Sequence, residues 1–125
     1  MNPPENDLPS RLPVWDAMQM LFMDTEVTHE YQYIARVCAE SDYSEDDLAR
    51  ILFNEVLPAL RFNLDALPTP QWTGFELQWL RERILTSHRF GRRRPWRGRR
   101  YVARHWQPLR AEIRRLRALH SGIMR

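Results

Sequence analysis

Lysine is absent from this 125-residue chain, so all 19 of its Lys and Arg positions are arginine. Cysteine occurs once, and Cys38 therefore cannot form an internal disulfide, which fits a reducing compartment. The N-terminus lacks the basic and apolar stretches of a signal peptide. No apolar run approaches the roughly 20 residues that a membrane-spanning helix needs. We therefore expect a cytoplasmic protein with no membrane partner.

The charges that are present are sorted along the chain. Residues 1–80 hold 14 Asp and Glu against four Arg, a net charge of −10. Residues 81–125 hold 15 Arg against two acids, a net charge of +13. The overall charge of +3 thus conceals a strongly dipolar molecule. This asymmetry indicates either a charged partner or docking of the two halves on each other.

Apolar residues recur at helical spacing, which predicts an all-α fold, a compact bundle of four to five helices in one domain over residues 1–125. We expect a flexible lead-in at 1–10 and an Arg-rich connection at 88–100. The expected helices are, in chain order, 11–23, 29–41, 45–57, 74–87 and a last helix that begins between 101 and 105 and is ended by Gly122.

Capping residues mark several helix starts. Ser10 is placed as the N-cap of the first helix. Ser44 with Asp47 resembles a capping box, with the shorter acid in place of Glu. Thr73 with Glu76 forms a complete capping box. These signals predict three N-terminal helix boundaries.

The inward faces of the predicted helices define a candidate core. Pro58 should end or kink the third helix at Leu57, because the residue before a proline disfavours helical geometry. Cys38 lies on the apolar face of the second helix and is expected to be a small core residue. The predicted core residues are Trp15, Leu21, Ile34, Val37, Ile51, Leu52, Leu80 and Ile84.

A family resemblance lies in three segments that follow one another along the chain: RLPVWDAMQMLFMDTE, YIARVCAESDYSEDDLARILFNEVLPAL and WTGFELQWLRERI. Together they resemble a family of small bacterial proteins classed as a domain of unknown function, over about residues 11–84. The resemblance implies a small, mainly helical bacterial protein. It implies no catalytic residues and gives no account of the Arg-rich segment.

No set of catalytic or metal-ligating residues can be assembled from the sequence. None of the four histidines has the i, i+4 spacing of a helical metal pair. Only four glycines are present, and they form no phosphate-binding loop. We therefore expect no enzyme activity, no metal and no cofactor.

Acidic residues cluster at two helix junctions. They suit either solvated first helical turns or a surface for a basic partner. The candidate partner-binding residues are Asp24, Glu26, Glu30, Glu40, Asp42, Glu45, Asp46 and Asp47.

The Arg-rich segment has two interpretations. Its arginines could pair with Asp16, Glu55 or Asp65 and stack on Trp96 and Trp106 within the molecule. Alternatively, guanidinium groups and aromatic rings could bind phosphates and bases. The candidate nucleic-acid-binding residues are then Arg92, Arg93, Arg94, Trp96, Arg97, Arg99 and Arg100.

These observations favour a non-enzymatic protein-binding module. An acidic surface without catalytic residues would suit an immunity or antitoxin protein that masks the basic cleft of a bacterial toxin. The alternative is a nucleic-acid-binding accessory protein that uses residues 89–106.

Overall fold

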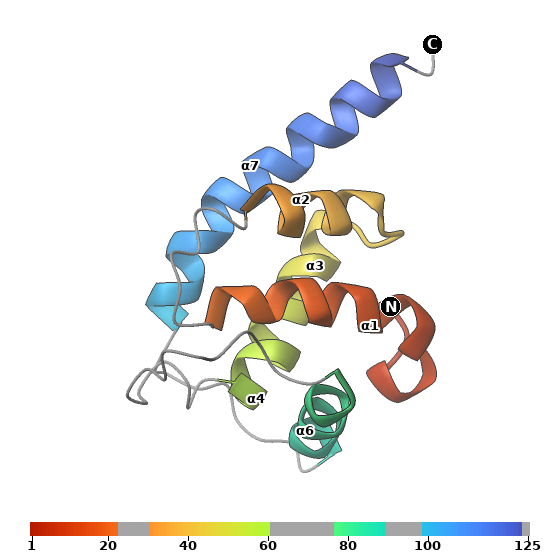
Figure 1. The fold of residues 1–125 in the computed structure, drawn as a ribbon, viewed down its shortest axis with the longest axis vertical. Helices are drawn as coiled ribbons and strands as arrows, with labels where there is room; N and C mark the ends of the chain where they lie inside the picture. Colours follow the sequence, from red (N-terminus) through yellow and green to blue (C-terminus); the bar gives the residue numbers. More distant parts are fainter. Residues whose placement is uncertain (23–30, 61–76, 90–98, 124–125) are drawn as a thin grey trace.

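A computed structural model describes residues 1–22, 31–60, 77–89 and 99–123 (Figure 1). All regular elements in these residues are helical. In chain order they are the 3₁₀-helix η1 (Pro4–Asn6), α1 (Leu8–Met18), the 3₁₀-helix η2 (Gln19–Phe22), α2 (Tyr31–Glu40), α3 (Glu45–Ile51), the π-helix η4 (Leu52–Val56), α4 (Leu57–Leu60), α6 (Leu77–Arg89) and α7 (Arg99–Ile123). Since α3, η4 and α4 are continuous, the predicted all-α bundle of four to five helices is confirmed.

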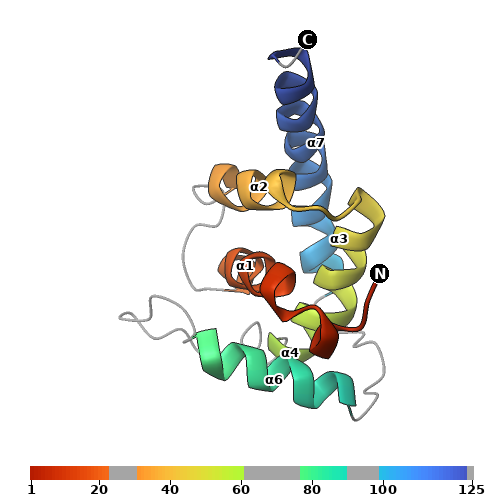
Figure 2. The ribbon, with the colours of Figure 1, turned by 90° about the vertical axis from the view of Figure 1, so that its right-hand side faces the viewer.

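The first long helix lies at the centre of the bundle. α1 lies between α2 on one side and α6 on the other, and it also contacts η4 (Figure 2). α7 packs mainly against α2 and crosses it (Figures 1 and 2). The C-terminal end of α7 projects beyond the other helices in both views.

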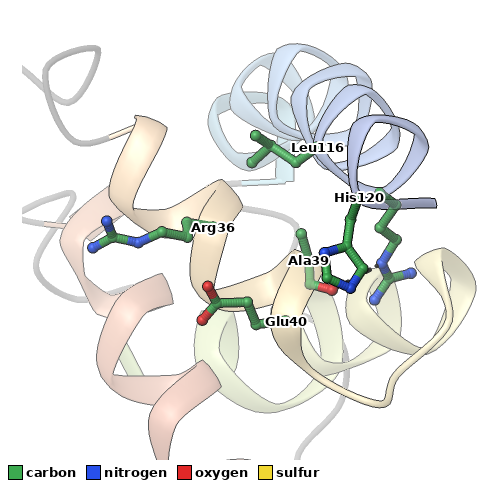
Figure 3. Close-up of a pocket in the computed structure, with 6 residues that line it drawn as sticks. Arg36, Ala39, Glu40, Leu116 and His120 are labelled. Atoms are coloured by element: carbon green, nitrogen blue, oxygen red, sulfur yellow. Dashed lines mark hydrogen bonds between the residues drawn. The ribbon is translucent and has the colours of Figure 1, made fainter. Parts of the chain in front are cut away.

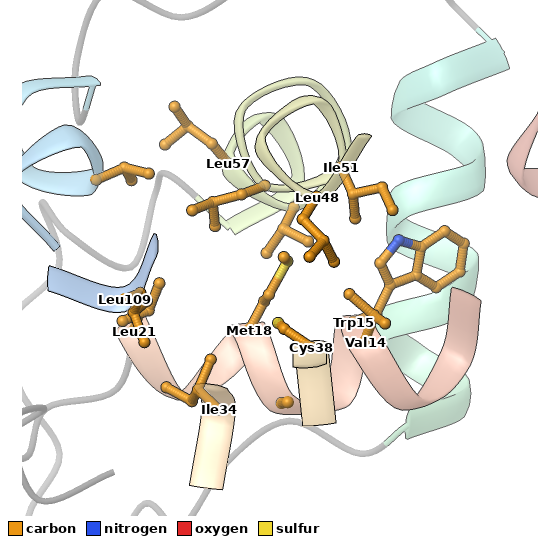
Figure 4. Packing of buried hydrophobic residues seen from close by; sticks show 14 of the residues in the cluster. Val14, Trp15, Met18, Leu21, Ile34, Cys38, Leu48, Ile51, Leu57 and Leu109 are labelled. Carbon is orange, nitrogen blue, oxygen red and sulfur yellow. The ribbon is translucent and has the colours of Figure 1, made fainter. Parts of the chain in front are cut away.

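One hydrophobic core joins these helices (Figure 4). Seven of the eight predicted core residues are buried, and Val37 is partly buried against the cluster. Cys38 is buried in the same cluster, and burial raises the pKa of its thiol to about 12. The interpretation of Cys38 as a core residue is thus confirmed.

The N-terminal boundary of α1 differs from the prediction. α1 begins at Leu8 rather than near Arg11, so Ser10 lies inside the first turn and is not the N-cap. Pro9 causes no break because the first helical turn needs no N–H donor there. The segment predicted as a flexible lead-in thus contains η1 and the start of α1.

A buried ion pair anchors this N-terminal segment. Arg11, only 1% exposed, donates to Glu55 through Nε at 3.0 Å and Nη2 at 2.9 Å. Trp15 Nε1 donates to the same carboxylate at 3.0 Å. Arg11 also donates to Asp7 Oδ2 at 2.6 Å and to the Asn2 carbonyl at 3.0 Å. Burial alone lowers the pKa of Arg11, but the Glu55 hydrogen bond and charge hold it above its ordinary value.

Glu55 therefore corrects one predicted pairing. It pairs with Arg11 of the acidic half, and no ion pair joins it to an arginine in the described part of the C-terminal half. Asp16 accepts a hydrogen bond from Gln19 at 2.7 Å. The third predicted partner, Asp65, lies outside the described residues.

The third helix starts as predicted but ends later. The Ser44 hydroxyl accepts from the Asp47 N–H at 3.1 Å, which confirms this N-cap. The helical segment that starts with α3 does not end at Leu57 but continues through η4 and α4 to Leu60. In η4 the backbone hydrogen bonds shift to the wider π register just before Pro58, which has no N–H to donate.

The last two helices are longer than predicted at three of their ends. α6 extends to Arg89, and the predicted N-cap Thr73 lies outside the described residues. α7 already includes Arg99 and continues through Gly122. Two residues at each end of the predicted 88–100 connection therefore belong to helices.

Candidate functional site at the junction of α2 and α7

One arginine of α7 holds the end of α2 and the turn that follows it. Arg117 donates to the carbonyl oxygens of Cys38 at 3.1 Å, Ala39 at 3.2 Å, Ser41 at 3.3 Å and Tyr43 at 2.6 Å. The C-terminal end of a helix leaves such carbonyls without intrahelical partners and carries a partial negative charge. Arg117 therefore fixes the turn between α2 and α3 against α7.

A second contact joins the start of α3 to α7. Glu45 Oε1 accepts from Arg110 Nε at 2.8 Å and from Arg114 Nε at 2.7 Å. The Arg110 hydrogen bond, supported by Arg114, holds the pKa of Glu45 below its ordinary value. Glu45 was predicted to be free for a partner, and that prediction is wrong because α7 supplies two guanidinium groups.

Three predicted acids remain available on this turn, and we call them the acidic edge: Glu40, Asp42 and Asp46. Each is exposed and makes no ion pair with another described residue. Asp47 is half-buried, with its carboxylate 3.8 Å from Arg50. The other predicted acids, Asp24, Glu26 and Glu30, lie outside the described residues.

A groove lies beside the acidic edge, between α2 and the projecting half of α7 (Figure 3). Its volume is about 640 Å³. We call it the α2–α7 groove, and the residues that line it are Arg36, Ala39, Glu40, Leu116, Arg117 and His120. Because Arg36, Glu40 and His120 are all exposed, the groove is open to solvent rather than enclosed.

Two of the candidate nucleic-acid-binding residues, Arg99 and Arg100, are among the described residues. The Arg99 guanidinium lies over the Phe53 ring at 5.1 Å, whereas Arg100 is exposed. Trp106 is buried in the core, only 7% exposed. Arg92, Arg93, Arg94, Trp96 and Arg97 lie outside the described residues. Of these two neighbouring arginines, Arg99 therefore contacts another side chain of the protein, whereas Arg100 lies on the surface.

One histidine has a defined environment in the first half of α7. His105 Nδ1 is hydrogen-bonded to the Tyr31 hydroxyl, and its ring lies edge-on to Tyr101 at 4.5 Å. Burial, with the neighbouring Arg104 charge, lowers the pKa of His105. Among the described residues, no three His, Cys, Asp or Glu side chains gather as a metal site.

None of the helices within residues 1–22, 31–60, 77–89 and 99–123 is both long and apolar enough to cross a membrane.

A family comparison covers most of the chain. Residues 9–119 match the family described as Domain of unknown function (DUF7079). The chain belongs to this family. The match extends the resemblance seen over 11–84 to α7, so it includes the acidic edge and most of the α2–α7 groove. No curated protein and no solved structure matches the chain.

Sequence reasoning missed the groove itself. Leu109, Ile113 and Leu116 are spaced i, i+4, i+7 and form an apolar stripe in the sequence, yet a stripe does not reveal where its covering helix ends. Leu119, which lies outside this stripe, is 51% exposed. The roles of Arg36 and Arg117 had no sequence signal, since each depends on the crossing of α2 and α7.

Proposed function

We propose that this chain is a non-enzymatic protein-binding module whose acidic edge binds a basic surface of another protein. The observation that carries the proposal is the exposure of Asp42 and Asp46 without an ion pair to another described residue. Arg110, Arg114 and Arg117 of α7 lie close by but contact Glu45 or backbone carbonyls instead. The edge therefore keeps its negative charge for a partner.

Electrostatic complementarity supports a protein partner of basic character. Complementary charge accelerates association and favours the correct partner. In its finer form, the proposal is an immunity or antitoxin protein that covers the basic cleft of a bacterial toxin.

We further propose that the protein acts in a bacterial cytoplasm. The single cysteine suits a reducing compartment because Cys38 cannot form an internal disulfide.

The test starts with toxin candidates encoded beside this gene. Each is co-expressed with the wild-type chain, with the double variant Asp42→Arg/Asp46→Arg and with Glu82→Arg, a reversal of an exposed acid on α6. We expect the wild-type chain and Glu82→Arg to restore growth and bind the toxin. The double variant should bind roughly tenfold or more weakly and with less salt dependence. Equal binding by the double variant would refute the role of the edge.

The nucleic-acid alternative has one observation in its favour. Arg100 and Arg104 are exposed on α7 and make no ion pair with another described residue. The purified chain is titrated against random-sequence duplex DNA and RNA over a range of salt. Tight binding at physiological salt, with a log–log salt slope that flattens in Arg100→Ala/Arg104→Ala, would favour this alternative over the protein partner.

A further inference from the structure

The lining of the α2–α7 groove is mainly charged or titratable. Ala39 and Leu116 are the two apolar side chains among its described lining residues. The other four are Arg36, Glu40, Arg117 and His120. The volume of about 640 Å³ lies within the range of sites that hold small molecules. The groove therefore suits a small polar ligand better than an apolar helix.

Arg117 gives the groove a cation that is already held in place. Its Nε and Nη2 donate to four carbonyl oxygens at the end of α2 and in the turn after it, at distances between 2.6 and 3.3 Å. Its Nη1 makes no hydrogen bond with another described residue, and the guanidinium makes no ion pair with a described carboxylate. A donor that is oriented in advance binds an anionic group at a lower entropic cost. Nη1 is therefore available for a carboxylate of a ligand.

His120 adds a second donor on the same side of the groove. It lies three residues after Arg117 in α7, so the two side chains are neighbours on the helix surface. His120 is exposed and is hydrogen-bonded to no other described residue. Even a neutral imidazole carries one N–H donor. Arg117 and His120 can therefore donate to one carboxylate together.

Glu40 supplies the opposite charge from α2. Figure 3 shows Glu40 and His120 on opposite sides of Ala39. Glu40 is exposed and makes no ion pair with another described residue. The Arg36 guanidinium, one helical turn earlier, lies over the Tyr33 ring at 5.9 Å from its centroid instead of pairing with Glu40. The Glu40 carboxylate would thus repel an anion and attract an ammonium group.

We propose that the α2–α7 groove binds a free amino acid with an apolar side chain. Arg117 Nη1 and His120 hold its α-carboxylate, Glu40 holds its α-ammonium group, and its side chain lies on Ala39 and Leu116. A simple anion would meet the unpaired charge of Glu40. A simple cation would meet the charge of Arg117. A ligand that carries both charges is complementary to both walls of the groove.

The amino-acid site does not depend on the proposed protein partner. Asp42 and Asp46, which the toxin-binding test reverses, do not line the groove. The ligand test below leaves both of these residues unchanged. Either proposal can therefore fail while the other stands.

The test is an NMR titration of the full chain with L-leucine, followed through its backbone amides. We expect saturable shifts at residues 36–40 and 116–120, with a Kd in the millimolar range or below. Two analogues separate the charges, because isocaproate lacks the ammonium group and leucinamide lacks the carboxylate. Each analogue should bind roughly tenfold or more weakly than leucine, since it loses one charged hydrogen-bonding group.

Variants at exposed residues test the two walls of the groove. Glu40→Gln should raise the Kd for leucine roughly tenfold and should not weaken isocaproate binding, because isocaproate has no ammonium group. His120→Ala should weaken the binding of both leucine and isocaproate. Glu82→Gln, at an exposed acid of α6, is the matched control and should change neither Kd. Circular dichroism of each variant checks that the helices are retained.

Three outcomes would overturn the proposal. The first is the absence of saturable shifts with leucine over the millimolar range. The second is binding of isocaproate or leucinamide as tight as that of leucine, which would indicate a site for a single charge. The third is an effect of Glu40→Gln on leucine binding no larger than that of Glu82→Gln.

Discussion

The apolar face of α7 continues from the first half of the helix to Leu116 in the second half, but the two halves have different surroundings. In the first half Val102, Trp106, Leu109 and Ile113 are buried against the other helices. In the second half, Leu116 is only partly covered and Leu119 is largely exposed. The difference teaches that periodicity defines which face of a helix is apolar, whereas the rest of the fold decides how much of that face is covered.

The largest expected effect is a difference in how much the two halves of α7 contribute to the free energy of unfolding. Ile113→Ala should lower the free energy of unfolding by about 2–5 kcal/mol, because a buried side chain is lost and a cavity remains. The matched change in the second half, Leu119→Ala, should alter it by less than about 0.5 kcal/mol. Urea unfolding measures both values at a protein concentration where the chain is monomeric. Equal losses would contradict the comparison.

The second effect concerns Arg117, which holds the end of α2 and the turn after it against α7. Arg117→Ala should cost about 2 kcal/mol, because four carbonyl groups lose a charged donor. Arg117→Lys should recover only part of this loss, since an ammonium group lacks the planar fork of a guanidinium. Urea unfolding gives the magnitude, and NMR amide shifts in residues 38–45 should report movement of the turn. Unchanged shifts in Arg117→Ala would contradict its anchoring role.

The ion pair at Glu45 should matter less. The arginine side chains that reach Glu45 are partly exposed, so Glu45→Ala should cost about 0.5 kcal/mol, with a smaller cost at high salt. Because the pKa of Glu45 is lowered in the folded state, its contribution is present above the ordinary value of 4.5 and is lost as the pH falls below it. Thermal unfolding across pH and salt tests this. A cost above about 2 kcal/mol would indicate a buried, strongly coupled pair instead.

The smallest expected effect is a pH dependence in the first half. The pKa of His105 is lowered in the folded state, so the unfolded chain binds a proton more readily. Stability from this group is complete above its ordinary value of 6.5 and decreases as the pH falls below it. In His105→Gln the stability curve between about pH 5 and 7 should be flatter than in the wild-type chain. Identical slopes would show that burial of His105 does not perturb its titration.

Glu45 and its neighbour Asp46 show that one of two adjacent residues can differ from its prediction while the other agrees with it. Glu45 and Asp46 are neighbours in the first turn of α3, and both were expected to be free. Glu45 is bound by two arginines of α7, whereas Asp46 is exposed. Rotation by one residue around a helix changes the direction of a side chain by about 100°. Whether a partner lies in that direction depends on a helix more than 60 residues away in the chain.

Several features of this protein were determined by the sequence itself. These are the all-α class, the core faces of the helices, the Ser44 N-cap and the separation of acidic from basic residues. The first three depend on residues within one or two helical turns, where side-chain spacing alone decides the contacts.

The tertiary structure decided which charges meet. Arg11 reaches Glu55 across 44 residues inside the acidic half, although the charge asymmetry had favoured a partner from the basic half. The crossing of α2 and α7 places Arg117 on the end of α2 and leaves Leu119 uncovered. The crossing depends on the packing of many side chains at once, so local spacing in the sequence does not predict it.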